Sequence, residues 1–466
     1  MLLLALIVFG ICGILFSTIT KNRSILILVL SAIAIGLFSL PSLILCFVLA
    51  CINYLFIKSI PKNKWLFSVS IGFNVVSLFA FHLYERFNEE WAVLPIIFGV
   101  TYLILQFIDY AGKVRFKIVN APASFIRYTS SVLYAPKFFM GPIASLSDIE
   151  KEINKPRKCF DKLNMTERSQ SEPVEDQAGY TYYGLNRILL GLFKKLVLAE
   201  SLSLYVSSAL DFKDNYPAIT ILSGACLYAL QLYFDFSGYC DIAIGASSLW
   251  NIKLPENFNF PFQQKTWDSF WKSWHSSLTN WLWQYVFMPL YLFFSRKKVR
   301  KLFTQSLCVL LVFTAMAFFN GIKSGFFISA GLYAMFYIFS LFFKTKIPYA
   351  SVFMFFLFSV GLLFFRTPNY SNYSFLAERL TDFKNFIPTE WTRLYFAPLA
   401  SGGTQQDYFN LSFTLVLCFG FLFFERKVTS VFTQNKIHVG YWFAAMLLIA
   451  LWGVFTSGSR FIYMQF

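Results

Sequence analysis

The chain has 466 residues, of which 57% are hydrophobic and only 14% are charged, and it contains 59 phenylalanines. Ordinary soluble domains carry about 25% charged residues, so this composition excludes a typical soluble protein and predicts a polytopic membrane protein. The net charge is +16, but the basic residues form short clusters between apolar runs. This pattern argues against nucleic acid as a partner and indicates membrane topology, with membrane lipids as the surroundings.

Apolar runs recur along the whole chain. A spanning helix needs about 20 largely apolar residues, and roughly twelve runs meet or approach this length. They are residues 2–20, 24–40, 41–57, 65–84, 93–110, 183–200, 217–238, 302–319, 325–343, 348–365, 409–424 and 440–457. We therefore expect an all-α polytopic membrane protein with roughly twelve transmembrane helices.

Lysine and arginine clusters test this assignment, because short cytoplasmic loops collect basic residues. With the N-terminus outside, the clusters all fall inside: Lys21/Arg23, Lys58/Lys62/Lys64, Lys113/Arg115/Lys117, Arg296–Lys301, Lys344/Lys346 and Arg426/Lys427. All the basic clusters can lie inside only if residues 118–142 and 255–295 each enter the membrane and return to the same side. Two re-entrant or interfacial helical segments are therefore predicted.

Two polar stretches are long enough to form substantial loops. Residues 143–182 are rich in basic side chains, which predicts a cytoplasmic loop that is either disordered or faces a partner. Residues 366–408 fall outside and either cap an external entrance or act as a flexible connector. The second loop carries five aromatic residues, Tyr370, Tyr373, Phe375, Phe383 and Phe386.

Two carboxylates, Asp235 and Asp241, lie within an apolar run. A carboxylate at membrane depth costs several kcal/mol unless it faces a protein interior or a cavity, so both are candidate substrate-binding residues, together with Ser237. Helical geometry places the two carboxylates some 240° apart, and Ser237 with Gly238 predicts a local break that re-aims one of them. The alternative is a structural role, in which the carboxylates pin that break.

Residues 258–278 form an amphipathic, aromatic stretch. Thr266 is a plausible N-cap, and Trp267, Trp271, Trp274, Leu278 and Trp281 follow at helical spacing. We expect one helix in the headgroup plane with its tryptophans towards the acyl chains. Asn259, Trp271 and Trp274 are candidate substrate-binding residues. His275 is a candidate catalytic residue, with a buried histidine in a structural hydrogen bond as the alternative.

Cysteine usage gives no sign of a metal site. The eight cysteines are scattered, mostly in apolar runs, and no CxxC spacing occurs. We therefore expect no bound metal, and the cysteines to serve as small apolar residues.

Several motifs in the middle of the chain agree with one family. They are Tyr233–Gly245, Leu254–Phe262, Phe270–Leu282 and Tyr285–Leu290, preceded by Phe138–Ile143 and Gly191–Lys195. Together they resemble the membrane-bound O-acyltransferase (MBOAT) family, and within it the bacterial branch of alginate O-acetylation and teichoic acid D-alanylation. On this basis the chain divides into N-terminal helices (1–110), an MBOAT core (111–345) and C-terminal helices (346–466).

The resemblance implies a helical ring around a central funnel in a bacterial cell membrane. It also implies transfer of an acyl group from a cytoplasmic thioester, carried by coenzyme A or an acyl-carrier protein, to a hydroxyl of an envelope glycan or lipid. No bound cofactor is expected. The acceptor hydroxyl needs a general base, for which histidine is well suited. Relatives of this branch work with partners, so an exported partner acyltransferase is also expected.

One position departs from the family pattern. Bacterial relatives carry two histidines, and this chain keeps the first as His275. Where the second histidine is expected, the sequence reads Phe319-Asn320-Gly321. An amide can donate and accept hydrogen bonds but cannot take up a proton near neutral pH. Asn320 can therefore orient a substrate or polarise a carbonyl, but it cannot be the base.

Three functions remain open at this stage. The first is a working acyltransferase in which His275, Asp235 or Asp241 is the base. The second is a catalytically inactive scaffold or acyl conduit for a partner enzyme. The third is a transporter that uses the central funnel, although no internal repeat supports it.

The charge pattern predicts the side of the membrane on which the tryptophan-rich segment lies. A cysteine introduced at Asp268 should react with an impermeant maleimide in inverted vesicles and stay unmodified in intact cells. Labelling of Asp268→Cys from outside intact cells, in a background that lacks the native cysteines, would overturn the proposed orientation.

Overall fold

The computed structural model describes residues 2–16, 22–91, 96–155, 177–210, 218–297, 299–342, 350–366, 405–434 and 438–454, together with 376, 380, 381 and 436. Within these ranges the chain is helical, and no strand occurs among them. Among the described residues, a helix overlaps every apolar run that the sequence marks as a possible span, although the bounds differ, as in 93–110, where the helix begins at Val100. Five of the described helices are long and apolar enough to cross a membrane. The all-α polytopic fold is thereby confirmed.

The chain forms two compact units, each made of several separate stretches. Unit 1 comprises Met1–Gly191, Tyr239–Pro255 and Ser430–Phe443, and unit 2 comprises Leu192–Gly238, Glu256–Thr429 and Ala444–Phe466. The division of the chain at residues 110 and 345 stays a prediction. Most of the loop 143–182 and all five aromatic residues of the loop 366–408 lie outside the described residues.

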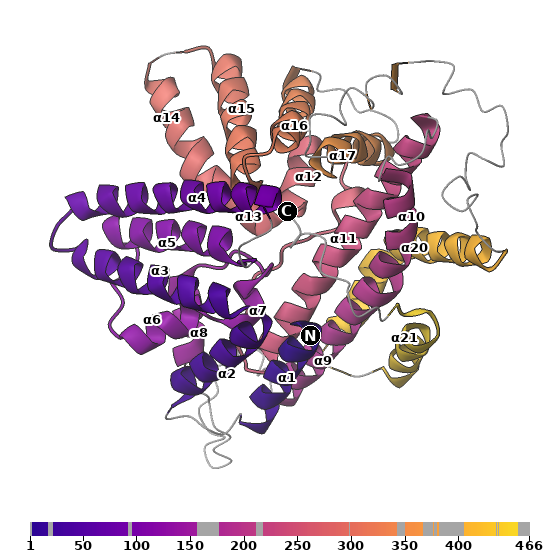
Figure 1. Ribbon diagram of the computed structural model, residues 1–466, viewed down its shortest axis with the longest axis horizontal. Coiled ribbons are helices and arrows are strands. Elements are labelled where there is room, and N and C mark those ends of the chain that lie inside the picture. Colours follow the sequence, from indigo (N-terminus) through magenta and orange to yellow (C-terminus); the bar gives the residue numbers. More distant parts are fainter. Residues whose placement is uncertain are drawn as a thin grey trace, which may run out of the picture. The chain divides into compact units, whose positions relative to one another are not determined.

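Unit 1 contains the N-terminal helices. These are α1 (Leu2–Leu15), α2 (Arg23–Phe38), α3 (Leu40–Ser59), α4 (Trp65–Trp91), α5 (Val100–Arg115), α6 (Phe125–Val132), α7 (Ala135–Phe138), α8 (Leu146–Asn154) and most of α9 (Gln177–Leu192). Helices α3, α4 and α5 lie side by side as a layer (Figure 1). The segment 118–142 consists of the short helices α6 and α7 joined by irregular backbone. This is the form expected of a re-entrant segment, whose depth in the membrane stays a prediction.

Helix α11 (Ala218–Ser248) is continuous and begins in unit 2 and ends in unit 1. The break predicted at Ser237–Gly238 is therefore wrong. Within unit 1 this helix packs closely against α9, because a Cβ added to Gly245 would lie 2.6 Å from the carbonyl oxygen of Gly184. Small residues at such a crossing let two backbones approach. One turn away, the guanidinium of Arg187 forms a buried ion pair with Asp241.

Unit 2 contains the helices of the central and later chain. They are a π-helical segment (Phe193–Ala199), α10 (Glu200–Leu210), a 3₁₀ turn (Pro261–Gln263), α12 (Trp267–Ser273), α13 (Ser276–Leu282), a second π segment (Trp283–Phe287), α14 (Met288–Arg296), α15 (Lys301–Asn320), α16 (Ser324–Phe342) and α17 (Ala350–Arg366). Helices α20 (Gln405–Phe432) and α21 (Val439–Trp452) each have residues in both units.

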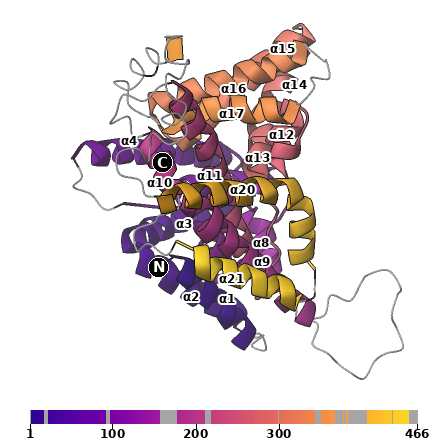
Figure 2. The ribbon, with the colours of Figure 1, turned by 90° about the vertical axis from the view of Figure 1, so that its right-hand side faces the viewer.

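Helices α15, α16 and α17 form the framework of unit 2. Successive helices pack against each other, and α12 packs against α16 (Figure 2). The turn between α15 and α16 is short because Gly321, with φ of 136°, takes a backbone conformation that a side chain would strain. The segment 255–295, predicted to be re-entrant, is likewise built from short, interrupted helices.

A buried charge cluster holds the first π segment of unit 2 to its neighbours. Lys195 is 1% exposed, and its ammonium group pairs with the carboxylates of Glu200 and Asp235. Because a buried charge is tolerated only when it is paired, the lysine and the carboxylates depend on each other. The cluster ties the π segment to α10 and α11.

Replacement of Lys195 by methionine should destabilise the protein strongly. The change leaves the carboxylates of Asp235 and Glu200 buried without this cation, which costs about 3–5 kcal/mol in comparable cases. We expect the thermal unfolding midpoint in detergent to fall by several degrees. The matched control is Lys272→Met, because the Lys272–Asp268 pair is exposed and worth at most about 1 kcal/mol. Equal midpoints for the two variants would contradict this account.

Candidate active site

The start of α12 follows the expected capping pattern. The Thr266 hydroxyl accepts a hydrogen bond from the backbone N–H of Ser269 at 3.1 Å, and the Ser269 hydroxyl accepts one from the Thr266 N–H at 3.3 Å. This reciprocal arrangement is a capping box, which satisfies two of the donors that every helix start leaves open. The prediction of Thr266 as N-cap is confirmed.

The predicted single helix over the tryptophan stripe is wrong. Helix α12 ends at Ser273, the following residue Trp274 is extended, and His275 takes a left-handed conformation with φ of 45° and ψ of 51°. Helix α13 then starts at Ser276. A left-handed residue with a side chain is uncommon and costs of order 1–3 kcal/mol, so the surrounding contacts must hold it.

The tryptophans of this segment are also placed differently from the expectation. Trp267, Trp271 and Trp274 are 6–7% exposed and pack inside unit 2, so they do not face lipid acyl chains. The Trp271 ring lies 5.2 Å from that of Tyr333, and the Trp274 ring lies 4.7 Å from that of Phe358. These aromatic contacts anchor α12 against α16 and α17.

The segment Glu256–Asn259, which is neither helix nor strand, is hydrogen-bonded to the break between α12 and α13, and we call it the clip. The backbone N–H of Asn259 donates to the Ser273 carbonyl at 3.0 Å, and the N–H of Ser276 donates to the Asn257 carbonyl at 2.9 Å. The Ser276 hydroxyl donates to the Glu256 carbonyl at 2.8 Å. The side chain of Asn257 reaches His275 itself, with 3.0 Å between Oδ1 and the imidazole Nδ1. These bonds fix the backbone on both sides of the left-handed residue.

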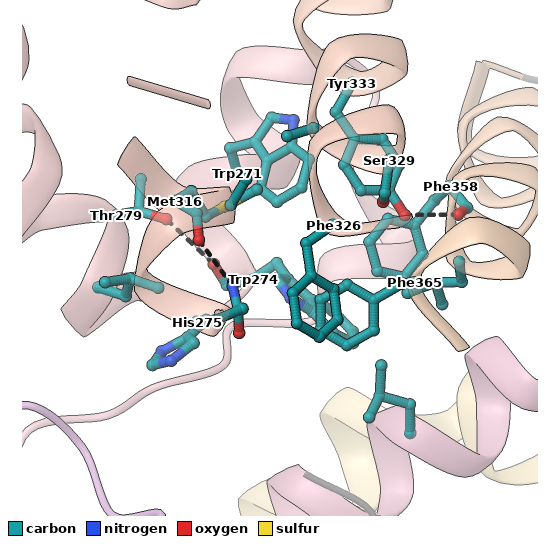
Figure 3. A pocket seen from close by; sticks show the side chains of 16 residues that line it. Trp271, Trp274, His275, Thr279, Met316, Phe326, Ser329, Tyr333, Phe358 and Phe365 are labelled. Atoms are coloured by element: carbon teal, nitrogen blue, oxygen red, sulfur yellow. Dashed lines mark hydrogen bonds between the residues drawn. The ribbon is translucent and has the colours of Figure 1, made fainter. Parts of the chain in front are cut away.

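His275 and Asn320 line one cavity in unit 2. Figure 3 shows this cavity, with Phe326 and Phe365 on one side and the His275 imidazole apart from them. Its lining comes from α11, α12, α13, α15, α16 and α17: Leu232, Trp271, Trp274, His275, Leu278, Thr279, Met316, Ala317, Asn320, Phe326, Ser329, Ala330, Tyr333, Phe358, Leu362 and Phe365. Most of these side chains are apolar, so the cavity suits an apolar part of a substrate, which gains free energy when it moves out of water.

Few polar groups face this cavity, and each is held by the fold. Asn320 is the last residue of α15, and its Nδ2 donates to the Met316 carbonyl at 2.8 Å. The Tyr333 hydroxyl donates to the Phe358 carbonyl at 2.8 Å, and the Thr279 hydroxyl donates to the Trp274 carbonyl at 3.3 Å, both drawn in Figure 3. The cavity therefore offers one imidazole and one carboxamide, together with the hydroxyls of Thr279, Ser329 and Tyr333, in a mostly apolar wall.

The predicted site residues separate into two groups. His275, Asn320, Trp271 and Trp274 belong to the cavity. The other four predicted residues are absent from the described lining. Asp235 pairs with Lys195 and Asp241 pairs with Arg187, Ser237 is buried on α11, and Asn259 is exposed. The structural role considered for the two carboxylates was to pin a break that α11 does not have; each instead pairs with a buried cation, and substrate binding by them stays a prediction.

Sequence reasoning missed Asn257. This side chain is fully buried and contacts His275, whereas Asn259, two residues later, is exposed. Residues two apart in a regular strand share one face, so the different burial of Asn257 and Asn259 shows that this segment is not a regular strand. The sequence pattern alone therefore does not select Asn257. Among the described residues, no group of three or more histidine, cysteine, aspartate or glutamate side chains could hold a metal ion.

Comparison with known proteins identifies the family. The model of the membrane-bound O-acyltransferase family matches residues 113–365, which is more than half of the chain and includes every residue of the cavity lining. The peptidoglycan O-acetyltransferase of Helicobacter pylori is 31% identical over 210 residues, which are 44% of this chain and 36% of that protein.

Two further relatives extend the match. The teichoic acid D-alanyltransferase of Bacillus subtilis is 27% identical over 352 residues, 71% of this chain and 82% of that protein. The probable alginate O-acetylase AlgI of Pseudomonas fluorescens is 26% identical over 234 residues, 50% of this chain and 43% of that protein. The chain thus spans less than half the length of the first and third of these relatives. With its apolar helices and this match, the chain is a multi-pass membrane protein that belongs to the membrane-bound O-acyltransferase family.

Proposed function

We propose that the chain transfers a small acyl group from a cytoplasmic thioester to a hydroxyl of an envelope glycan or lipid. One observation carries this proposal: His275 and Asn320, from the two motif segments that are 45 residues apart in the sequence, line the same apolar cavity within the region matched by the family model. The cavity combines a group that can accept a proton with a group that can bind a carbonyl oxygen. Those are the two needs of acyl transfer to a hydroxyl.

Each residue has a distinct task in this reaction. The acceptor oxygen attacks the thioester carbonyl carbon, and the His275 imidazole takes the hydroxyl proton. Asn320 donates a hydrogen bond to the carbonyl oxygen as negative charge develops there. The carbon–sulfur bond then breaks, and the thiolate leaves and takes a proton. The apolar wall excludes water, which would otherwise compete with the acceptor for the thioester.

The names of the relatives support a small acyl group and a polymeric acceptor. The three described above are named for O-acetylation of peptidoglycan, D-alanylation of teichoic acid and O-acetylation of alginate. Acetyl and D-alanyl groups have few atoms, and the three acceptors are polymers with many hydroxyl groups. We extend the shared chemistry to this chain, with coenzyme A or an acyl-carrier protein as the donor carrier and no bound cofactor. An exported acyltransferase is proposed as the partner that completes delivery to the polymer.

One observation favours a second candidate function. Asn320 stands where bacterial relatives carry a histidine, and a carboxamide cannot act as a base. In that alternative the fold binds the acyl donor and presents it to a partner enzyme without catalysing the transfer. The two functions differ in whether the purified chain turns over.

His275→Ala should abolish most turnover if the chain is an enzyme. Loss of a positioned base costs about 10²–10⁴-fold in rate, and here no second histidine is present in the described lining. The measurement is acyl transfer by purified protein from a labelled acyl thioester to an extract of envelope glycans. His438→Ala is the control, because His438 is partly exposed, is absent from the described cavity lining and bonds the exposed Gln434 at 2.9 Å. Unchanged turnover in His275→Ala would remove His275 from the mechanism.

Asn320→His separates the two candidate functions. In a working enzyme the wild type turns over, and Asn320→Ala should lower kcat by about 10²–10³-fold through loss of the carbonyl hydrogen bond. In the scaffold alternative the wild type is inactive, and Asn320→His should create turnover because the rest of the cavity is intact. An inactive wild type together with an inactive Asn320→His would count against acyl transfer at this cavity.

A further inference from the structure

We infer that Asn257 is the positioning residue for His275 and holds the imidazole in the tautomer with its proton on Nδ1. This places the lone pair on Nε2, the nitrogen that would accept the proton of the acceptor hydroxyl. The inference rests on the proposed function, since it concerns the base of that reaction. It is carried by three hydrogen bonds that meet at one atom, the Oδ1 of Asn257.

The first step identifies that atom as an oxygen. A side-chain amide can be turned so that either its oxygen or its nitrogen faces a neighbour, and the hydrogen-bond network decides between them. The backbone N–H of Ser277 points at this atom from 3.2 Å. A backbone N–H can only donate, so the atom must accept, and it is the amide oxygen. The Ser277 hydroxyl, at 2.9 Å, donates to the same oxygen.

The second step follows from the chemistry of imidazole. The Nδ1 of His275 lies 3.0 Å from the same oxygen. Two acceptors cannot share a hydrogen bond, so Nδ1 carries the proton. A neutral imidazole has a single N–H, and the other nitrogen then holds a lone pair in the ring plane. The lone pair is therefore on Nε2, on the edge of the ring away from Asn257.

The third step concerns orientation. Asn257 is fully buried, and the Phe236 ring stands nearly perpendicular to the imidazole, at 86° and 4.8 Å between centroids. The ring is thus held by a hydrogen bond on one edge and by an aromatic contact. The same amide oxygen accepts from the N–H of Ser277 in the first turn of α13, so it also caps that helix. One side chain therefore fixes both the start of α13 and the base in front of it.

The test begins with a measurement that does not depend on activity. The chain has only three histidines, so ¹⁵N-histidine labelling gives few ring-nitrogen resonances, and His275→Gln identifies those of His275. We expect a protonated Nδ1 and an unprotonated Nε2 in the wild type. Asn257→Leu keeps a side chain of similar size but removes the acceptor, and it should shift His275 towards the Nε2–H tautomer. A proton on Nε2 in the wild type would overturn the inference.

The activity arm uses matched variants. Asn257→Leu should lower kcat at least about tenfold with a smaller change in KM, because the ring edge that accepts the proton is wrong. Asn257→Asp should retain turnover, since a carboxylate also accepts from Nδ1. In that variant the acidic limb of the pH profile should move to higher pH, because the carboxylate stabilises the protonated imidazole. A merely structural role for Asn257 would not move this limb.

Ser276→Ala is the control for the fold of the clip. It removes the hydroxyl's hydrogen bond to the Glu256 carbonyl but keeps the backbone bond to Asn257 and the Asn257 amide, so His275 should keep its proton on Nδ1. A shift of tautomer in Ser276→Ala equal to that in Asn257→Leu would overturn the specific role of Asn257. Turnover retained in His275→Ala would instead defeat the proposed base, while the tautomer measurement would still report on Asn257 alone.

Discussion

The left-handed backbone at His275 is the constraint on which the candidate site depends. A continuous helix over residues 267–282 would keep its apolar stripe on one face and leave the histidine on that helix's flank. The break turns α13 away from α12 at the histidine. Such a conformation persists only when its surroundings determine it, and here the segment Glu256–Asn259 supplies hydrogen bonds on both sides of the break. The left-handed backbone at His275, the hydrogen bonds from Glu256–Asn259 and the position of the imidazole therefore depend on one another.

Burial determines which polar and charged groups of the site must be paired. In an apolar interior a polar group is costly unless it is paired, and the side chains of His275, Asn320 and Tyr333 are paired with the Asn257 amide and with the helix carbonyls of Met316 and Phe358. The buried cations are also paired: Lys195 pairs with the carboxylates of Glu200 and Asp235, and Arg187 pairs with that of Asp241. The carboxylates of Asp235, Glu200 and Asp241 are thus occupied with charge pairing, and of the two titratable side chains in the described lining, His275 and Tyr333, the imidazole is the one that ordinarily titrates near neutral pH.

The sequence predicted the helices well and the site in part. Apolar runs of about 20 residues predict helices because a helix satisfies its own backbone hydrogen bonds within the membrane, and a described helix overlaps each such run. Thr266 was predictable as a cap because the capping box is local. The break at His275 was not predictable, since it depends on Asn257, which is 18 residues distant. The predicted break at Ser237–Gly238 failed for a similar reason: tertiary packing overrides the weak helix propensity of one serine and one glycine.

An asparagine at position 320, where the family resemblance implies a histidine, is compatible with catalysis because the protons of the proposed reaction still balance. Transfer of an acyl group from a thioester to a hydroxyl releases one proton from the acceptor and requires one for the departing thiolate. A single imidazole that accepts the first and returns it closes this balance, so a second base is not demanded by stoichiometry. What the second position must supply is stabilisation of the carbonyl oxygen, and a carboxamide donates a hydrogen bond for that purpose. The reaction then depends on one well-oriented histidine, which is why the tautomer set by Asn257 decides whether the cavity can work.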